Sequence, residues 1–322
     1  MSAGPQPLNA DDLARCPTVP NCPLCAQANV TPHARARDVE YYTVDRWFVF
    51  YRCLSCDVLF IDPMETDRLD EIYPPQYYSF APAVRSIAQN VKEWLDRVHL
   101  SRNLRHVPGR DLAALDIGGG TGWLLDLLRT ADPRIARTCV VDIDAGARAR
   151  AEQAGHRYFQ GRIEQFPAAE HFDVILMLNL IEHVPDPRAV LSKARDLLTR
   201  EGRLFIKTPN FDAWDARLFR HRSWGGYHTP RHFVLFRRES LERLCRECGF
   251  EIVGFSYTQG APFWSVSMLD LLRRLGLVSI SSDRPAIRHP LMPALQALFA
   301  GIDFARKPFA RLSQMQLVLG LA

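Results

Sequence analysis

The stretch Leu115-Asp116-Ile117-Gly118-Gly119-Gly120-Thr121-Gly122 decides the fold of this chain. It ends an apolar run, Ala113–Ile117, that suits a buried strand, and an apolar run at 123–128 that opens a helix follows it. Glycine is needed where the backbone turns sharply and approaches a ligand with no Cβ in the way. The start of the helix adds free N–H groups and a positive dipole end. The stretch therefore predicts a ligand-binding turn between a strand and a helix.

Short apolar strands and amphipathic helices alternate through the rest of the chain, a pattern typical of an α/β fold with a parallel sheet. The sequence predicts seven strands, at Ala113–Ile117, Thr138–Ile143, Arg157–Gln160, Asp173–Leu178, Arg203–Thr208, Ile252–Tyr257 and Gln314–Leu319. Helices are expected to begin near Gly122, Ala145, Glu164 and Pro187, and another is expected to run from Ser240 as its N-cap to Gly249.

An acidic residue, Asp142, ends the second strand of this series. At such a position a carboxylate can accept both ribose hydroxyls of an adenosine. The pattern Asp116-x-Gly118-x-Gly120-x-Gly122 matches the first motif of class I S-adenosylmethionine-dependent methyltransferases. In the dinucleotide-binding fingerprint the third glycine comes one residue later. The chain therefore resembles these methyltransferases, and a dinucleotide-dependent oxidoreductase is the weaker alternative.

The resemblance continues downstream and covers about residues 112–258. Phe172–Ile175, followed by Asn179–Pro187, is similar to the fourth-strand motif of the same family. The resemblance implies a seven-stranded Rossmann-like sheet and S-adenosylmethionine as cofactor. The cofactor-binding positions it implies are Asp116, Gly118, Gly119, Gly120, Gly122, Asp142, Ile143, Ile163 and Asn179. The family often has an acid where this chain has Arg162, with Glu164 two residues on, so the side chain that meets the adenine is left open.

Four cysteines form two pairs of equal spacing, Cys22-x-x-Cys25 and Cys53-x-x-Cys56. Two residues between cysteines allow both thiolates to face one ion, and two such turns complete a tetrahedral site. The sequence therefore predicts a structural Zn²⁺ site. A nucleic-acid-binding ribbon is less favoured, since the intervening runs Tyr41–Val44 and Trp47–Tyr51 are aromatic strand candidates and not basic.

The predicted organisation has four parts. A flexible tail at 1–20 precedes a zinc-binding ribbon at 21–61 and a helical connector or cap at 62–110. A class I methyltransferase domain fills 111–322, with a helical insertion at 262–313 before the last strand. In the connector, a helix is expected from about Ala83 to Arg105, and Tyr73, Tyr77 and Tyr78 either cover the cofactor or pack the connector.

Candidate catalytic residues lie in loops after the fourth and fifth strands, because ligands bind beyond the carboxyl ends of parallel strands. His232 or His228 is the expected general base, and Tyr227 is expected to orient the acceptor. His183 is the second choice, because the Glu-His pair lies near the sulfonium in relatives. The alternative is that these side chains only hold the loop onto the sheet.

The expected reaction moves a methyl group to a small-molecule or glycan-like acceptor and releases S-adenosylhomocysteine. Tyr227-His228 followed by His232 is similar to the Tyr-His-x-His motif of deoxysugar C-methyltransferases, although the spacing departs from it and their additional C-terminal domain is missing. A C-methyltransferase of a nucleotide-linked deoxysugar is therefore an alternative. A non-enzymatic module that only senses the cofactor is another.

Composition and the predicted C-terminal helices limit the classes of partner that we expect for this chain. The chain has a net charge of +4 and no run of like charges, so a nucleic-acid partner is not indicated. Without a secretory signal or a membrane span, a cytoplasmic location is expected. The segments Phe263–Leu277 and Leu291–Phe309 are unusually apolar and bordered by basic residues. They cover the sheet, form a dimer interface, or contact a membrane that presents a lipid-linked acceptor; the oligomeric state is left open.

Overall fold

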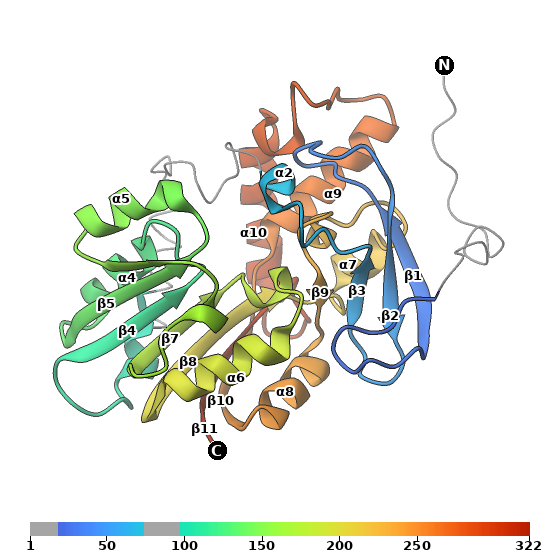
Figure 1. Cartoon of the computed structure of the whole chain (residues 1–322). Helices are drawn as coiled ribbons and strands as arrows, with labels where there is room; N and C mark the ends of the chain where they lie inside the picture. The colour runs from blue at the N-terminus through green and yellow to red at the C-terminus, as the bar shows by residue number, and fades with distance from the viewer. Residues whose placement is uncertain (1–18, 74–96, 99) are drawn as a thin grey trace.

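The computed structural model describes residues 19–73, 97–98 and 100–322, and two sheets organise them (Figure 1). The larger has seven strands in the order β10-β11-β8-β7-β4-β5-β6. All pairings within it are parallel except those of β11, which runs antiparallel to both β8 and β10. Its strands are β4 (Leu112–Ile117), β5 (Ile135–Asp142), β6 (Arg157–Gln160), β7 (Phe172–Leu178), β8 (Leu198–Pro209), β10 (Phe250–Thr258) and β11 (Gln314–Leu321). The predicted seven-stranded α/β sheet is confirmed.

Helices cover both faces of this sheet, which is why every residue of β4 is buried. The apolar sides of α4 (Trp123–Ala131) and α5 (Ala145–Gln153) pack on one face. Those of α6 (Pro187–Leu197) and α8 (Arg238–Glu247) pack on the other.

Two expected helix starts are wrong. The residue that caps α8 is Arg237, and Ser240 lies one turn inside, where its hydroxyl accepts a hydrogen bond from the Arg237 N–H at 3.1 Å. The stretch near Glu164 forms only a three-residue 3₁₀ turn, η1 (Ile163–Gln165), since Phe166 is already extended. Gly249, with φ +86°, does end α8 as expected.

The smaller sheet joins the N-terminal unit to the rest of the chain. Its order is β1-β2-β3-β9, and all its pairs are antiparallel. Three strands come from the N-terminal unit, but the fourth comes from the segment after β8. The strands are β1 (Val30–Ala36), β2 (Phe48–Cys53), β3 (Leu59–Asp62) and β9 (Val234–Leu235). The cysteine-bearing unit expected at 21–61 is therefore completed by a distant strand.

The predicted strand Tyr41–Val44 is instead a loop wound around Asp38. The Asp38 carboxylate accepts hydrogen bonds from the N–H groups of Glu40, Tyr41 and Thr43 and from the Thr43 hydroxyl, at 2.8–3.0 Å. Since these N–H groups point at one side chain, they cannot form a strand ladder.

The insertion before the last strand is present as α9 (Ala261–Arg274) and α10 (Met292–Arg306), with the short turn η4 (Ala286–Arg288) between them. No helix among the described residues is long and apolar enough to span a bilayer. The connector helix expected at Ala83–Arg105 falls largely outside the described residues, although 97–98 and 100–104 are helical. Tyr77, Tyr78 and residues 1–18 of the expected tail also lie outside them.

A buried arginine, Arg231, fastens the two sheets together. Its guanidinium pairs with the Asp38 carboxylate at 3.0 Å, and both side chains are fully buried. The same guanidinium donates to the carbonyl oxygen of Ile72 at 2.6 Å and to the Thr43 hydroxyl at 3.0 Å. It also lies over the Tyr41 ring, 4.6 Å from the centroid. Apart from the cation–π contact, these contacts are charge-assisted hydrogen bonds made by a buried guanidinium.

Replacing Asp38 with alanine should leave the Arg231 charge buried without its counter-ion. We expect the Asp38→Ala change to lower the free energy of unfolding by about 3–5 kcal/mol in urea titrations. Glu247→Ala, which removes an exposed ion pair with Arg188, is the matched control and should cost about 1 kcal/mol or less. Equal losses for the two variants would contradict this role of Asp38.

Candidate functional site

The glycine loop between β4 and α4 has the backbone that only glycine adopts easily. Gly118, Gly120 and Gly122 have φ of +75°, +51° and +81°. A Cβ at Gly122 would lie 2.4 Å from the His156 ring, and one at Gly119 would lie 2.6 Å from the Asp116 carboxylate. The loop therefore packs closely against the side chains of His156 and Asp116, and Gly122 is the N-cap of α4.

Two carboxylates lie beneath and beside this loop at the carboxyl ends of adjacent strands. Asp116, at the end of β4, is fully buried, and its Oδ2 has no hydrogen-bond partner within the described part of the chain. Burial, and secondarily the nearby Asp142 charge, raises the pKa of Asp116 well above its usual range. Asp142 ends β5 and accepts hydrogen bonds from the N–H groups of Gly120 and Asp144 at 2.8 and 2.9 Å. Burial also raises the Asp142 pKa.

The other expected cofactor positions follow the same strand ends. Ile143 comes directly after β5 and is half exposed, whereas Ile163 is buried in η1 after β6. Arg162 and Glu164 beside it are both exposed. Asn179 follows β7 with φ +55°, and its side-chain oxygen accepts a hydrogen bond from Gln314 at 3.0 Å. The structure thus gathers these positions on one edge of the sheet.

Leu180 connects the glycine loop to a buried histidine cluster. Its side chain lies so close to Gly118 that a Cβ there would be 2.9 Å away. The next residues form the turn η2 (Ile181–His183), which places Glu182 and His183 beside His232. The rings of His183 and His232 are 4.6 Å apart between centroids. Two of the expected catalytic residues are therefore brought together next to the glycine loop.

Hydrogen bonds define which nitrogen of each ring carries a proton. Nδ1 of His232 lies 2.8 Å from the Gly226 carbonyl oxygen, and Nδ1 of His183 lies 3.0 Å from that of Arg231. Because a carbonyl only accepts, both Nδ1 atoms donate, and both Nε2 atoms are bare in the neutral rings. Burial, with the neighbouring histidines second, lowers the pKa of His183 to about 3 and that of His232 well below its usual range. Both rings are thus neutral at neutral pH.

Glu182 is the acidic member of the cluster. Its Oε2 accepts a hydrogen bond from the Thr208 hydroxyl at 2.9 Å, while Oε1 lies 3.9 Å from Nε2 of His232. Complete burial raises the Glu182 pKa to about 8. The donor atoms of Glu182, His183 and His232 lie within 4.8 Å of one another, a set that could also hold a metal ion.

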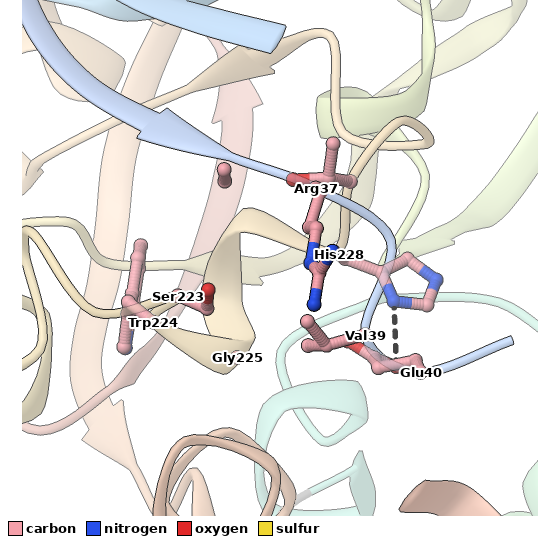
Figure 2. A pocket seen from close by; sticks show the side chains of 9 residues that line it. Arg37, Val39, Glu40, Ser223, Trp224, Gly225 and His228 are labelled. Carbon is pink, nitrogen blue, oxygen red and sulfur yellow. Dashed lines mark hydrogen bonds and ion pairs between the residues drawn. The ribbon is translucent and has the colours of Figure 1, made fainter. Parts of the chain in front are cut away.

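His228, the third histidine, faces the N-terminal unit. Its Nδ1 lies 2.9 Å from Oε2 of Glu40, and its ring centroid is 4.9 Å from that of His232. Figure 2 shows His228 and Glu40 beside a small pocket that lies between the end of β1 and the turn η3 (Gly225–Tyr227). The pocket is lined by Ala36, Arg37, Val39, Glu40, Ser223, Trp224, Gly225, His228 and Thr229.

Tyr227 and Tyr73 differ in their contacts with the histidine cluster. The ring of Tyr227 stacks on Phe50 at 4.5 Å, and its hydroxyl donates to the Arg220 carbonyl oxygen at 3.2 Å. The structure therefore places the Tyr227 hydroxyl apart from the histidines. The hydroxyl of Tyr73 lies 2.9 Å from Nδ1 of His183.

The four paired cysteines converge at the far end of the small sheet. Sγ of Cys22 lies 3.5 Å from that of Cys56, and Sγ of Cys25 lies 3.5 Å from that of Cys53. All four sulfur atoms lie within 4.8 Å of one another. A tetrahedral ion with bonds of about 2.3 Å requires sulfur atoms about 3.8 Å apart, so the cluster has the dimensions of a Cys₄ site.

Comparison with known proteins agrees with this geometry. Residues 85–254, more than half of the chain, match the family model described as a methyltransferase domain. The chain belongs to the S-adenosylmethionine-dependent methyltransferases. The matching family is a methyltransferase domain and not a dinucleotide-dependent oxidoreductase, so the oxidoreductase alternative is not supported.

Individual relatives of this methyltransferase include curated O-methyltransferases. A ubiquinone biosynthesis O-methyltransferase of Cereibacter sphaeroides (strain ATCC 17025) is 38% identical over 188 residues, covering 51% of this chain and 72% of the relative. A malonyl-[acyl-carrier protein] O-methyltransferase of Hahella chejuensis is 25% identical over 235 residues, covering 70% and 81%. The solved plantazolicin methyltransferase BpumL in complex with SAH is 16% identical, with a TM-score of 0.46 over 72% of this chain and 84% of that one. These relatives give no support to the resemblance to sugar C-methyltransferases.

Two acids in the methyltransferase site, Glu40 and Glu182, are missed as functional candidates by sequence reasoning. Glu182 stands next to His183 in the fourth-strand motif, so its position in the sequence is a usable signal. Glu40 lies 188 residues from its partner His228, and nothing in its local sequence points to that contact.

The Glu182→Gln variant tests whether the raised pKa of Glu182 makes stability depend on pH. Since the folded-state pKa of Glu182, about 8, lies above its usual value of 4.5, the unfolded chain releases this proton first, and stability falls as pH rises between these values. We expect Glu182→Gln, a mimic of the neutral acid, nearly to match the wild type at pH 4.5 and to be more stable by roughly 4–5 kcal/mol at pH 9. Urea titrations at both pH values measure this difference. A wild-type pH dependence retained in the variant would rule it out.

Proposed function

We propose that this methyltransferase transfers the methyl group of S-adenosylmethionine to a hydroxyl oxygen of a small-molecule or glycan-like acceptor, with His232 as general base. The bare, buried Nε2 of His232 next to the glycine loop is the observation that supports this assignment. The names of the curated relatives, which are O-methyltransferases, support oxygen as the accepting atom.

The glycine loop and the two strand-end acids are suited to the cofactor. Asp142, at the end of β5, would accept the ribose hydroxyls. Asp116 has a buried, unpartnered oxygen under the loop, and a cationic ligand nearby would favour its ionised form. The backbone of Gly118–Gly122 leaves no Cβ in the way of the ligand. Ile143, Ile163 and Asn179 would border the same site.

Bound S-adenosylmethionine supplies an electrophilic methyl carbon on a sulfonium. In our proposal, Nε2 of His232 takes the hydroxyl proton of the acceptor as the acceptor oxygen bonds to that carbon. The carbon–sulfur bond breaks, and S-adenosylhomocysteine leaves. Glu182, 3.9 Å from Nε2, would stabilise the imidazolium once ionised. His183 and His228 would line the acceptor side, and Tyr227 would hold the loop in place.

The four-cysteine cluster would hold a structural Zn²⁺. Its four ligands leave no open position for a substrate, so the metal would not act in catalysis. The cluster ties the loop before β1 to the end of β2 and the turn that follows it.

Variants at the two parts of the site should separate binding from chemistry. We expect His232→Asn to slow S-adenosylhomocysteine release by about 10²–10³-fold with a small-molecule cell extract as acceptor source, because the base is lost. Its S-adenosylmethionine affinity, measured by calorimetry, should stay unchanged. Asp142→Ala should instead weaken that affinity by about tenfold or more, since two charge-assisted hydrogen bonds are lost. Full activity of His232→Asn would disprove the assignment of the base.

Metal analysis tests the cysteine cluster. We expect about one Zn²⁺ per chain by atomic absorption, and its removal by a chelator with a thiol reagent should lower Tm by roughly 10 °C or more. Cys53→Ser should lose the metal, whereas the control Cys245→Ala, at a buried cysteine outside the cluster, should keep it. A metal-free protein with an unchanged Tm would contradict the proposal.

A further inference from the structure

The exposed residues of α10 are unusually apolar. From Pro293 to Ala305, every exposed residue is apolar or glycine. Leu298, Ile302 and Phe304 are 56%, 41% and 78% exposed. A helix at the surface of a globular protein normally places charged residues on its exposed face.

The inner face of α10 shows that this orientation is fixed. Its one acid, Asp303, is fully buried, where it accepts a hydrogen bond from the Gly260 N–H at 2.9 Å and pairs with Arg306 at 3.0 Å. One turn earlier, Phe299 stacks on Trp264 of α9 at 5.1 Å. Rotating α10 to hide its apolar face would break these contacts and expose the buried side. The helix is therefore held with Asp303 inside and with Leu298, Ile302 and Phe304 outside.

The apolar surface extends beyond α10. Large apolar side chains are also exposed just after α9 and at both ends of α10. Trp214 of α7 (Trp214–Leu218) is exposed as well, and the Arg306 guanidinium lies 5.3 Å from its ring centroid. We call this the insertion patch: Trp214, Leu275, Leu277, Leu291, Leu298, Ile302, Phe304 and Phe309. Seven exposed large apolar residues on one insertion, with Trp214 beside Arg306, indicate a binding surface.

The charge of the insertion is positive. Residues 262–313 contain seven arginine and lysine residues and three aspartates, a net charge of +4, which equals that of the whole chain. Two of the aspartates, Asp270 and Asp303, are buried and paired with arginines. Arg288 before α10 and Lys307 after it are exposed. The apolar face thus lies between exposed positive charges.

We propose that the insertion patch docks this methyltransferase on an anionic lipid surface. Apolar side chains between basic residues are the pattern of a helix that lies in the membrane interface. A second copy of the chain fits less well, because a symmetric dimer would bring together two insertions that each carry a net charge of +4. Docking through this patch does not depend on which acceptor receives the methyl group.

Docking would place the histidine cluster close to the membrane. The start of α9 packs on η3, where a Cβ at Gly225 would lie 2.5 Å from the Phe263 carbonyl oxygen. Further along, Leu269 packs with Val39 of the N-terminal unit. Figure 1 shows α10 next to α9. The same insertion therefore covers the site and presents the patch.

Vesicle co-sedimentation with the full chain tests the proposal. We expect binding to vesicles that contain phosphatidylglycerol and weaker binding to pure phosphatidylcholine. The triple change Leu298→Ser, Ile302→Ser and Phe304→Ser should reduce binding by about tenfold or more, because these side chains would enter the lipid. Arg288→Glu with Lys307→Glu should remove the preference for the anionic lipid.

Matched controls separate docking from folding. Val19→Ser with Val253→Ser removes exposed apolar side chains elsewhere and should leave vesicle binding unchanged. All variants should keep the Tm and the S-adenosylmethionine affinity of the wild type, since the altered side chains are exposed. Wild-type vesicle binding by the triple variant, or none by the wild type, would overturn the proposal. So would a wild-type dimer in light scattering that the triple variant abolishes, because the patch would then join two copies.

Discussion

The buried ion pair between Arg231 and Asp38 is the contact on which the site depends. It connects the loop after β8 to the N-terminal unit, and the carbonyl oxygen of Arg231 also accepts the Nδ1 proton of His183. A buried guanidinium without its carboxylate would be costly, so the two units cannot separate freely. The protonation pattern of one histidine is therefore tied to the packing of two sheets.

The site itself contains groups that the fold alone does not favour. Asp116 and Glu182 are carboxyl groups buried with an unpartnered oxygen, and their raised pKa values express the cost of ionising them there. Positive φ angles in the glycine loop restrict three positions to glycine. Such costs are typical of positions selected for ligand binding and not for stability. The family assignment agrees with this location, at the carboxyl ends of β4, β5 and β7.

The insertion has the opposite arrangement of polarity. In α10 the acid lies inside while Leu298, Ile302 and Phe304 lie outside, whereas α6 and α8 bury their apolar sides against the sheet. The sequence alone allows three roles for the apolar C-terminal segments: they cover the sheet, form a dimer interface or contact a membrane. The structure divides these roles, because α9 covers the site while α10 packs through Phe299 and Asp303 and leaves its other face exposed.

Local sequence determined the elements whose cause is local. Strand periodicity, the glycines of the 115–122 loop and the Cys-x-x-Cys turns depend on sterics and spacing within a few residues, so all seven strands and both cysteine pairs could be predicted. Tertiary structure decided what depends on distant partners. Asp38 turned the predicted strand Tyr41–Val44 into a loop, and β9 completed the N-terminal sheet. Glu40 meets His228 across 188 residues. The hydrogen-bond partners of buried polar groups come from distant parts of the sequence, so a local sequence pattern cannot predict them.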